Sequence, residues 1–365
     1  MAAAAAANVH PDPINLGIGE PVEPPAEEVS AAAMRAARDG EARYGPADGL
    51  PELRELAAED QTRRSGIARS LENVIITAGG KPALMDAMRC LVNPGDEVLV
   101  LAPFWPSFLQ QVQLAGGVAR IVQPGPDMLP DPAAIASACT ERTRLVILNN
   151  PGNPTSQILG AERLRAIAEV VDEHDLWVLA DEVYSGLVLD GDSRGLLNIC
   201  PDLADRTVVV ESFSKRFCMT GYRLGYACAP AAVIEAMTRL ATASTTCVNI
   251  LAQHAGMAAL RMDGSWVEGQ RRTYLRRRDE TAARLLAMGC DLHKTPEAGF
   301  YHFFRAPGVE DDVTWARGLF EQEGVTLIPG TAFGVPSRMR LSYGATDARL
   351  EEAAVRIQHY LDCNS

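Results

Sequence analysis

Lysine is nearly absent from this chain of 365 residues. Of its 34 basic residues only three are lysines, Lys81, Lys215 and Lys294, and the others are arginines. Both side chains carry charge, but only lysine readily loses its proton and attacks a carbonyl as an amine. Lys215 follows two serines in ESFSKRFCMTGYRLGY, residues 211–226. A surface lysine in a serine-rich loop would not explain why lysine stands where this chain otherwise uses arginine, so we predict a chemical role for it.

Membrane-spanning and secretory segments are also lacking. No run of 18 apolar residues appears, so no transmembrane helix is expected. The start, MAAAAAANVH, has no basic segment and no long apolar core, which argues against a secretory signal and for a frayed terminus. The net charge of −13 argues against nucleic acid and anionic membranes as partners. We therefore expect a cytoplasmic protein without either kind of partner.

Metal-binding motifs are missing as well. The eight cysteines form no CxxC pair, and none lies near a histidine at the spacing of a metal site. We expect free thiols, mostly in apolar surroundings, in a reducing compartment. The six histidines are scattered, and His174 is predicted at the end of a helix. No metal site is predicted.

What the chain does contain is an alternation of β-branched runs and helical patterns. Helical patterns cover Pro82 to Leu91, Ala161 to Glu173 and Ala231 to Ala243. Several of the runs are apolar at every position, as expected for strands buried on both faces of a mostly parallel sheet. The alternation predicts an α/β, doubly wound core with seven strands. The predicted strands are 73-NVIITAG, 97-EVLVLAP, 118-VARIVQP, 144-RLVILNNP, 176-LWVLADEV, 207-TVVVESF and 224-LGYACAP.

The pattern changes after about residue 262. An arginine-rich helix, VEGQRRTYLRRRDETAARLLAMG, is predicted from about Ser265, and the strand-like segments GFYHFFRAP, VTLIPG and MRLSYG follow it. A closing helix is predicted from Asp347 to Leu361. We predict three parts: an N-terminal arm over residues 1–40 that belongs to the small domain, a large domain over 41–262, and a small α+β domain over 263–365.

Polar residues gather at the carboxyl ends of the predicted strands, where ligands of open α/β sheets bind. The first strand leads into TAGGKPAL, where Gly79 and Gly80 free backbone N–H groups and Pro82 suits the first position of a helix. Such a helix start can bind phosphate, although the same sequence often forms only a turn. Neither a Walker loop nor a GxGxxG motif between strand and helix is present.

Two further strand ends carry candidate ligand contacts. The second strand ends in PFWPSF, where Trp105 could stack on a flat ring or pack in the core between prolines. The fourth strand ends in NNPGNPTS, where Asn153 could donate a hydrogen bond into a cleft or belong to a plain turn. Taken singly, neither segment identifies a ligand.

The fifth and sixth strand ends carry charge. Asp181 follows an apolar run in LADEVY, and a carboxylate at the edge of a core needs a positive partner that no neighbouring residue supplies. The sixth strand ends in ESFSK, which places the hydroxyls of Ser212 and Ser214 beside Lys215. Arg223 adds a rigid fork that suits a phosphate.

Together these strand ends describe one ligand. It carries a phosphate, a flat ring with a cationic nitrogen, and an aldehyde that reacts with Lys215. It also has a ring oxygen that takes hydrogen bonds from Asn153 and Tyr184. Pyridoxal 5′-phosphate has all of these groups, so we predict it as the cofactor.

The sequence resembles the class I and II aminotransferases, pyridoxal-phosphate enzymes of fold type I that include the aspartate aminotransferases. The resemblance runs from INLGIGEP to RMRLSYG and is strongest in SFSKRFCMTGYRLGY, which is similar to the family pattern SxSKxxxxxGxRxGY. It implies a large domain with a seven-stranded, mostly parallel sheet and a smaller α+β domain. The residues that match in order and spacing are Asn153, Asp181, Tyr184, Lys215 and Arg223.

The resemblance implies a role for each matching residue. Lys215 would form the internal aldimine and then move the substrate's α-proton. Asp181 would keep the ring nitrogen protonated, Tyr184 and Asn153 would bind the ring's phenolic oxygen, and Trp105 would stack on the ring. The residues expected at the phosphate are Gly79, Gly80, Lys81, Ser212, Ser214 and Arg223.

Substrate contacts are implied as well. Arg340 in RMRLSYG matches the arginine that clamps the substrate's α-carboxylate, with Arg338 as the adjacent alternative. Phe300, Tyr301 and Phe333 could form an apolar wall of the pocket or belong to the small-domain core. The other residues expected at the substrate are Ile18, Gly19, Trp105 and Asn153.

Two further features bear on assembly and reaction. Tyr44 in RYGPADGLPELR matches a tyrosine that reaches the phosphate in the neighbouring subunit, which implies a homodimer with shared sites. Ser156 stands where the family's NPTG has glycine, which weakens the expectation of an ordinary aminotransferase.

Three functions are open at this point. The leading one is an aminotransferase that acts on an α-amino acid and a 2-oxo acid through Lys215. The alternative is a β- or γ-elimination, replacement, cyclisation or carbon–carbon bond-forming reaction of the same fold. A regulator's effector domain is the third, but the acidic chain has only about 13 residues before INLGIGEP for a DNA-binding domain. The substrate is not predicted, since no second arginine for a dicarboxylate can be placed.

Overall fold

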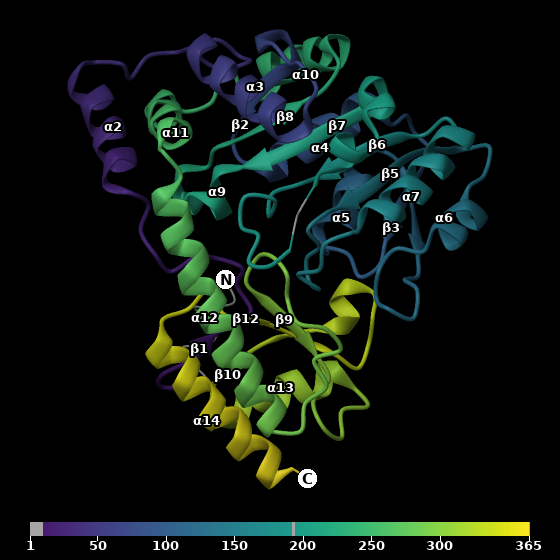
Figure 1. Ribbon diagram of the computed structural model, residues 1–365, viewed down its shortest axis with the longest axis vertical. Coiled ribbons are helices and arrows are strands. Elements are labelled where there is room, and N and C mark those ends of the chain that lie inside the picture. The colour runs from purple at the N-terminus through teal and green to yellow at the C-terminus, as the bar shows by residue number, and fades with distance from the viewer. Residues whose placement is uncertain (1–9, 192–193, 365) are drawn as a thin grey trace.

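A seven-stranded sheet forms the centre of the larger unit in this computed structural model, which describes residues 10–191 and 194–364 (Figure 1). Its strands are β2 (Val74–Thr77), β3 (Glu97–Leu101), β4 (Val118–Val122), β5 (Thr143–Asn149), β6 (Trp177–Asp181), β7 (Thr207–Ser212) and β8 (Gly225–Cys228). Their order is β2-β8-β7-β6-β5-β3-β4. β8 runs opposite to the other six strands, which all point the same way, so the predicted mostly parallel sheet is confirmed.

Helices cover both faces of this sheet. They are α2 (Glu27–Arg38), α3 (Pro51–Ser65), α4 (Gly80–Leu91), α5 (Ser107–Leu114), α6 (Pro132–Ala138), α7 (Ala161–Glu173), α8 (Leu196–Ile199), α9 (Phe213–Arg216), α10 (Ala231–Ser244) and α11 (Ile250–Arg261). Side chains alternate along β2, so Val74 and Ile76 join one buried cluster with α3, α7 and α11. Ile75 joins the other cluster with α4, α5 and α10. Apolar strands buried on both faces therefore require this double layer of helices.

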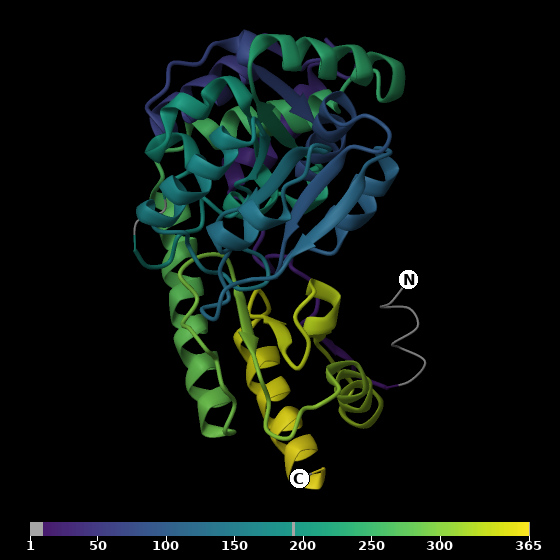
Figure 2. The same cartoon turned by 90° about the vertical axis from the view of Figure 1, so that its right-hand side faces the viewer.

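A smaller unit lies below the sheet and contains a three-stranded antiparallel sheet of order β11-β12-β9. Its elements are α12 (Ser265–Ala287), β9 (Tyr301–Phe304), α13 (Asp312–Glu323), β10 (Val325–Thr326), β11 (Ile328–Pro329), β12 (Met339–Ser342) and α14 (Asp347–Cys363). Short 3-10 segments are η1 (Leu71–Asn73), η2 (Pro201–Arg206), η3 (Thr220–Tyr222) and η4 (Gly330–Phe333). In Figures 1 and 2, α12 runs from the larger unit down along the smaller one.

The N-terminal segment contacts both units. Strand β1 (Ile14–Asn15) pairs in parallel with β10, and Ile14 is buried in the core of the smaller unit. Helix α2 packs instead against α11, and Val29 belongs to the core of the larger unit. The division at residues 40 and 262 stays a prediction.

Helix α4 begins earlier than the sequence suggested. Gly79 is its N-cap and Gly80 its first residue, so Pro82 is the third residue rather than the first. Proline is tolerated there because the N–H groups of a first helical turn have no intrahelical acceptor. The shift brings Gly80 and Lys81 into the helix start. His174 is the C-cap of α7, as predicted.

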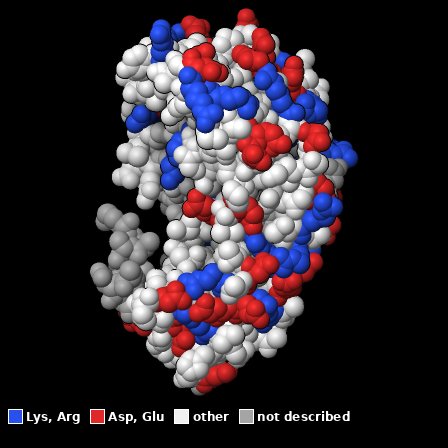
Figure 3. All heavy atoms as spheres, turned by 90° about the vertical axis from the view of Figure 1, so that its left-hand side faces the viewer, with Lys and Arg blue, Asp and Glu red and all other residues white. Residues whose placement is uncertain are grey.

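Acidic and basic side chains are mixed over the face shown in Figure 3. Some of them form surface ion pairs, such as Arg276 with Asp347 at 2.7 Å and Arg349 with Asp12 at 2.7 Å. All eight cysteines are free, and Cys218, Cys228 and Cys290 are fully buried. Within the described residues, no helix combines the length and the apolar character needed to cross a membrane.

Candidate active site

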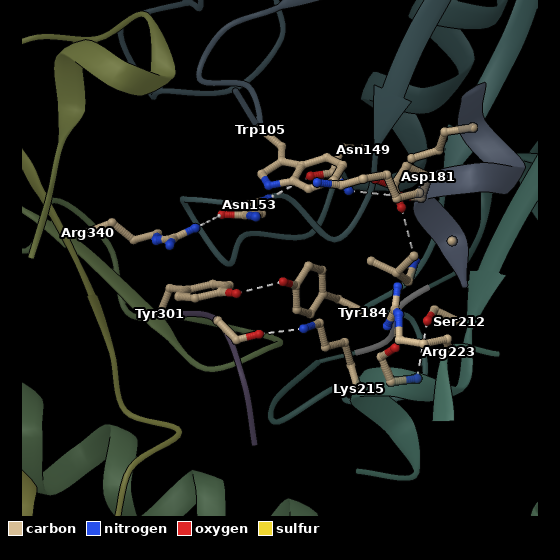
Figure 4. Close-up of a pocket in the computed structure, with 16 residues that line it drawn as sticks. Trp105, Asn149, Asn153, Asp181, Tyr184, Ser212, Lys215, Arg223, Tyr301 and Arg340 are labelled. Carbon is tan, nitrogen blue, oxygen red and sulfur yellow. Dashed lines mark hydrogen bonds between the residues drawn. The ribbon is translucent and has the colours of Figure 1, made fainter. Parts of the chain in front are cut away.

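The predicted site residues converge on a pocket between the carboxyl ends of the central strands and the smaller unit (Figure 4). All of them line this pocket except Gly79, Ile18 and Tyr44. Parallel neighbours β5, β6 and β7 end at one edge of the sheet, which brings their last residues together. Sequence reasoning did not assign Leu84, Asn149 and Val183 to the pocket, and it left Tyr301 open between the pocket wall and the small-domain core.

One end of the pocket is built to hold an anion. The start of α4 supplies the free backbone N–H groups and positive helix end at Gly80. Ser212 ends β7 and Ser214 begins the next turn, which adds two hydroxyls. A methyl group on Gly79 would lie 2.7 Å from Nη2 of Arg223, and Gly79 has a φ of +101°, so glycine is needed there. Amides, hydroxyls and a guanidinium together suit a phosphate.

Asp181 is a buried carboxylate at the end of β6. Its side chain is 3% exposed, and its Oδ1 accepts a 3.3 Å hydrogen bond from the N–H of Val183. Burial, and to a lesser extent the charge of Glu211, raise the pKa of Asp181 to about 7. Within the described residues, no lysine or arginine forms an ion pair with Asp181, so a ligand cation would favour its ionised form.

Lys215 presents a buried amine to the same pocket. Burial, with smaller contributions from Arg340 and Arg223, lowers the pKa of Lys215 from 10.5 to about 8, against the opposing effect of Glu20. Its Nζ donates a hydrogen bond to the carbonyl oxygen of Gly19. A lysine with a lowered pKa has a substantial neutral fraction near neutral pH, which makes it a nucleophile and a base.

Two tyrosines and an asparagine place hydroxyl and amide groups between these charged residues. The hydroxyls of Tyr184 and Tyr301 lie 2.7 Å apart, and both side chains are buried. Burial raises the pKa of Tyr184 well above its usual value, so the phenol stays neutral. The loop of Asn153 is tied down by Asn149, whose Oδ1 accepts from the N–H of Asn153 at 2.7 Å. Asn149 also donates to the carbonyl oxygen of Asp181 at 3.0 Å.

Arg340 rather than Arg338 lines the pocket. Its Nη1 donates to Oδ1 of Asn153 at 2.8 Å, and its guanidinium lies 4.5 Å from the ring centre of Tyr301. Its buried Nε has no hydrogen-bond partner within the described residues. Arg338 makes a long 3.5 Å contact with Asp291 instead. A substrate carboxylate can therefore meet Arg340 but not Arg338.

Trp105 and Lys81 form another wall. The indole packs edge-on against Phe108 with ring centres 5.6 Å apart. The Nζ of Lys81 lies 4.7 Å from the indole centre, a cation–π contact. Among the residues that the structure describes, Lys81 forms no ion pair. Its positive charge is therefore available to a ligand.

Three predicted residues lie outside the pocket. Gly79 stands behind it at the N-cap of α4. Ile18 is 52% exposed and lines a neighbouring hollow with Glu20. Tyr44 is 88% exposed on the surface.

Ser156, which departs from the family's glycine, is buried behind the pocket. Its φ of +56° is the left-handed conformation that glycine adopts most easily. Its hydroxyl accepts a 3.3 Å hydrogen bond from the N–H of Tyr301, and its carbonyl oxygen accepts from Glu297 at 2.8 Å. The serine therefore links the Asn153 loop to β9 and does not line the pocket.

Sequence signals for the missed residues were weak. Tyr301 was expected either in an apolar wall or in the core, and it does both, since it packs in the core and lines the pocket. Phe300 and Phe333 are core residues. Asn149 stands in the same NNPG segment as the predicted Asn153, but nothing local shows that its side chain holds Asp181.

The donor set of the pocket fits pyridoxal 5′-phosphate. The anion cradle suits its phosphate, Asp181 suits its ring cation, and Lys215 suits its aldehyde. Tyr184 and Asn153 supply donors for the ring oxygen, and Trp105 supplies a flat aromatic surface. Arg340, whose Nε has no hydrogen-bond partner among the described residues, suits a carboxylate of a second molecule.

Comparison with known proteins gives the same result. Residues 11–357 match the family described as aminotransferase class I and II. The chain is 37% identical to the aspartate/prephenate aminotransferase of Thermus thermophilus, over 96% of this chain and 91% of the relative. It is 35% identical to the aspartate aminotransferase of Thermotoga maritima, over 96% of this chain and 92% of that relative.

Solved structures agree. Aspartate aminotransferase from Thermus thermophilus with maleate superposes with a TM-score of 0.93 at 36% identity, covering 98% of this chain and 95% of that one. The aspartate aminotransferase of Rhizobium meliloti superposes with a TM-score of 0.94 at 33% identity, covering 99% of this chain and 94% of that one.

Proposed function

Because this chain belongs to the class I and II aminotransferase family and is a pyridoxal-5′-phosphate-dependent aminotransferase, we propose that it uses a dicarboxylic α-amino acid and a 2-oxo acid, with Lys215 as its reactive amine. The observation that carries the residue assignment is the meeting of Lys215, Asp181 and Arg340 at one pocket. The cofactor, when bound, supplies an aldehyde for the amino group and a ring that accepts electrons from the substrate's Cα.

Each pocket residue then has one task. Lys215 would hold the cofactor through its aldehyde, and the Nζ would serve as the base at the substrate's Cα. Asp181 holds the ring through the cationic nitrogen. Tyr184 and Asn153 donate hydrogen bonds to the ring oxygen, and Trp105 covers the ring. The phosphate is held by the Gly80 N–H, Ser212, Ser214 and Arg223.

The number of cations in the pocket supports a dicarboxylic substrate. Four positively charged side chains line it: Lys81, Lys215, Arg223 and Arg340. Three have tasks at the aldehyde, the phosphate and the α-carboxylate. We assign Lys81 to a second substrate carboxylate, in place of the phosphate contact expected from the sequence. By their names, the relatives act on aspartate and prephenate, and both of these molecules carry two carboxylates.

The test compares acidic amino acids with their neutral amides. Purified protein with cofactor is mixed with aspartate or asparagine, and with glutamate or glutamine, and the cofactor's absorbance and the released 2-oxo acid are measured. We expect the acidic member of each pair to have a kcat/KM about tenfold or more higher, the worth of one charge-assisted contact. Lys81→Gln should remove this preference and leave the amide reactions unchanged. Equal rates for acid and amide in the unsubstituted protein would reject the dicarboxylic substrate.

We also propose a homodimer in which Tyr44 reaches the phosphate of the partner's site. The exposure of this aromatic side chain, 88%, supports the proposal. Mixing Lys215→Ala with Tyr44→Phe protein should restore activity in hybrid dimers. A monomer in light scattering at working concentration would reject the shared site. The eight free cysteines support a cytoplasmic location, since reducing compartments keep thiols unpaired.

A further inference from the structure

A cluster of charged side chains lies on the far side of the sheet from the pocket. Side chains alternate between the two faces along a strand. At the end of β7, Ser212 lines the pocket, so its neighbour Glu211 points to the other face. At the end of β6, Asp181 lines the pocket, and the next residue, Glu182, lines a separate cavity. Residues adjacent in sequence thus connect this cluster to the site.

Arg64 connects the cluster to helix α3. From the last turn of α3, its Nη1 donates to the carboxylate of Glu211 and to Oγ of Ser185, the latter at 2.6 Å. Ser185 in turn donates to Glu211 at 2.5 Å. The Nε of Arg64 lies 3.5 Å from a carboxylate oxygen of Asp60. One guanidinium therefore joins α3 to the strand that ends in the pocket.

The cluster reaches Lys215 as well. Arg216, the next residue, donates from Nη1 to both carboxylate oxygens of Asp60, at 3.1 and 3.0 Å. Asp60 is 2% exposed and also accepts a 3.2 Å hydrogen bond from the hydroxyl of Tyr226. Since α9 is only one turn long, this ion pair helps to hold the turn that carries the reactive amine.

The cluster sets three buried carboxyl groups against two guanidinium groups. Its carboxylates are Asp60, Glu182 and Glu211, and its guanidinium groups are Arg64 and Arg216. Arg63 reaches Asp60 at 2.7 Å, but its side chain is 63% exposed, so water screens it. Buried charges act over longer distances because little water screens them. The charge of Glu211 raises the pKa of Asp181, and burial together with Glu211 raises that of Glu182 to about 7.

We propose that Arg64 and Glu211 are positioning residues of the reaction: as a pair behind the sheet they tie the end of β7 to α3, and the charge of Glu211, which Arg64 offsets, acts on Asp181 at the end of the neighbouring strand. The proposal rests on the assignment of Asp181 and Lys215 to the cofactor, and it is independent of the substrate. The charged groups that act on Asp181 are Glu211 and Lys215, and the carboxyl groups of Asp181 and Glu182 are coupled to each other. Those that act on Glu211 are Arg64, Asp60, Arg216 and Glu182.

The charge role is tested by opposite shifts. The readout is the pH midpoint of the absorbance change of the bound cofactor. Arg64→Gln removes a positive charge near the pocket. The bound cofactor should then lose its proton at a higher pH, so the pH midpoint of the absorbance change should rise by about half a unit or more. Glu211→Gln removes a negative charge and lowers the midpoint by a similar amount. The double variant should return it to within a few tenths of the original value, because the net charge is restored.

The positioning role is tested by a conservative variant and a neighbouring control. Arg64→Lys keeps the charge but loses the fork that contacts two partners, so the midpoint stays while kcat falls several-fold with little change in KM. Arg63→Gln, on the next residue, leaves the midpoint and kcat unchanged, because Arg63 is exposed and does not contact Glu211.

The outcomes separate this inference from the proposed function. Unchanged midpoints in Arg64→Gln and Glu211→Gln, or shifts in the same direction, would overturn the charge role. If Arg64→Gln does not fold, Glu211→Gln alone must lower the midpoint, and failure to do so overturns it equally. If the cofactor attaches to a residue other than Lys215, the proposed function is wrong, and the cofactor's absorbance no longer tests this inference. Thermal unfolding of the cofactor-free variants then still tests the pair: each single substitution should lower the melting temperature, because it leaves a buried charge unpaired, and the double variant should lose less than the sum of the two.

Discussion

Nη1 of Arg340 donates a 2.8 Å hydrogen bond to Oδ1 of Asn153, across 187 residues of sequence and between the two units of the protein. Nη2 of the same guanidinium donates to the carbonyl oxygen of Gly17 at 2.5 Å. The proposed carboxylate clamp is thus oriented by the loop after β5 and by the N-terminal segment. A substrate carboxylate bound to Arg340 would compete with the Gly17 carbonyl, which would couple binding to the position of that segment.

Arg340→Gln should raise KM for the amino-acid substrate about 10- to 100-fold, because a charge-assisted contact is worth about 1.5–3 kcal/mol. Steady-state kinetics measure it. The control is Arg338→Gln, two residues earlier and outside the pocket, for which kcat/KM per folded molecule should change less than about threefold. A larger effect at Arg338 would reverse the assignment.

Cofactor attachment should become faster as the pH rises through about 8. The pKa of Lys215 is lowered from 10.5 to about 8, so its neutral, reactive fraction reaches one half near that pH. Stopped-flow absorbance after mixing cofactor-free protein with the cofactor gives the rate at each pH. Borohydride reduction and peptide mapping identify the modified residue, and the chain supplies its own controls in Lys81 and Lys294. Label on either of these would refute the role of Lys215.

Asp181 should make the cofactor-free protein less stable as the pH rises from about 4 to 7. The folded pKa of Asp181, about 7, exceeds the ordinary 3.8, so the folded state binds more protons in this window and loses stability until the group is ionised. Above about pH 7 its contribution is constant. Asp181→Asn should flatten this decline by an amount on the order of 2–4 kcal/mol.

The measurement is chemical denaturation of cofactor-free protein at several pH values. Asp190→Asn is the control, since its side chain is 75% exposed and its substitution should leave the decline unchanged. The same slope in wild type and Asp181→Asn would show that Glu182 and Glu211, whose pKa values burial also raises, account for the decline.

Gly19→Ala should impair the pocket although it adds only one methyl group. An added Cβ would lie 1.8 Å from the hydroxyl of Tyr301, so either the N-terminal segment or the tyrosine must move. We expect a severalfold rise in KM. Overpacking should also lower the free energy of unfolding by about 1–3 kcal/mol. Gly160→Ala, where a Cβ would meet open space, is the matched control. Unchanged kinetics in Gly19→Ala would show that the segment does not shape the site.

The central sheet and several of the reactive residues can be predicted from short stretches of sequence. All seven strands of the central sheet lie within the predicted runs to within one residue, and the central strands are apolar because they are buried on both faces. The ends of those runs carry Asp181, Ser212 and Lys215, and the parallel order brings such ends together. The scarcity of lysine singles out Lys215 without any structure, because its chemistry is a property of the residue itself.

The tertiary structure decided what depends on distant partners. Arg338 and Arg340 are indistinguishable in RMRLSYG, and only packing against Asn153 and Tyr301 separates them. The same holds for Asn149 and for the Arg64–Glu211 pair, whose partners are 32 and 147 residues away. Periodicity and residue chemistry are short-range properties, so the sequence determined the sheet and its reactive ends. The contacts that orient and charge those ends are made between remote segments, and only the folded chain brings them within reach.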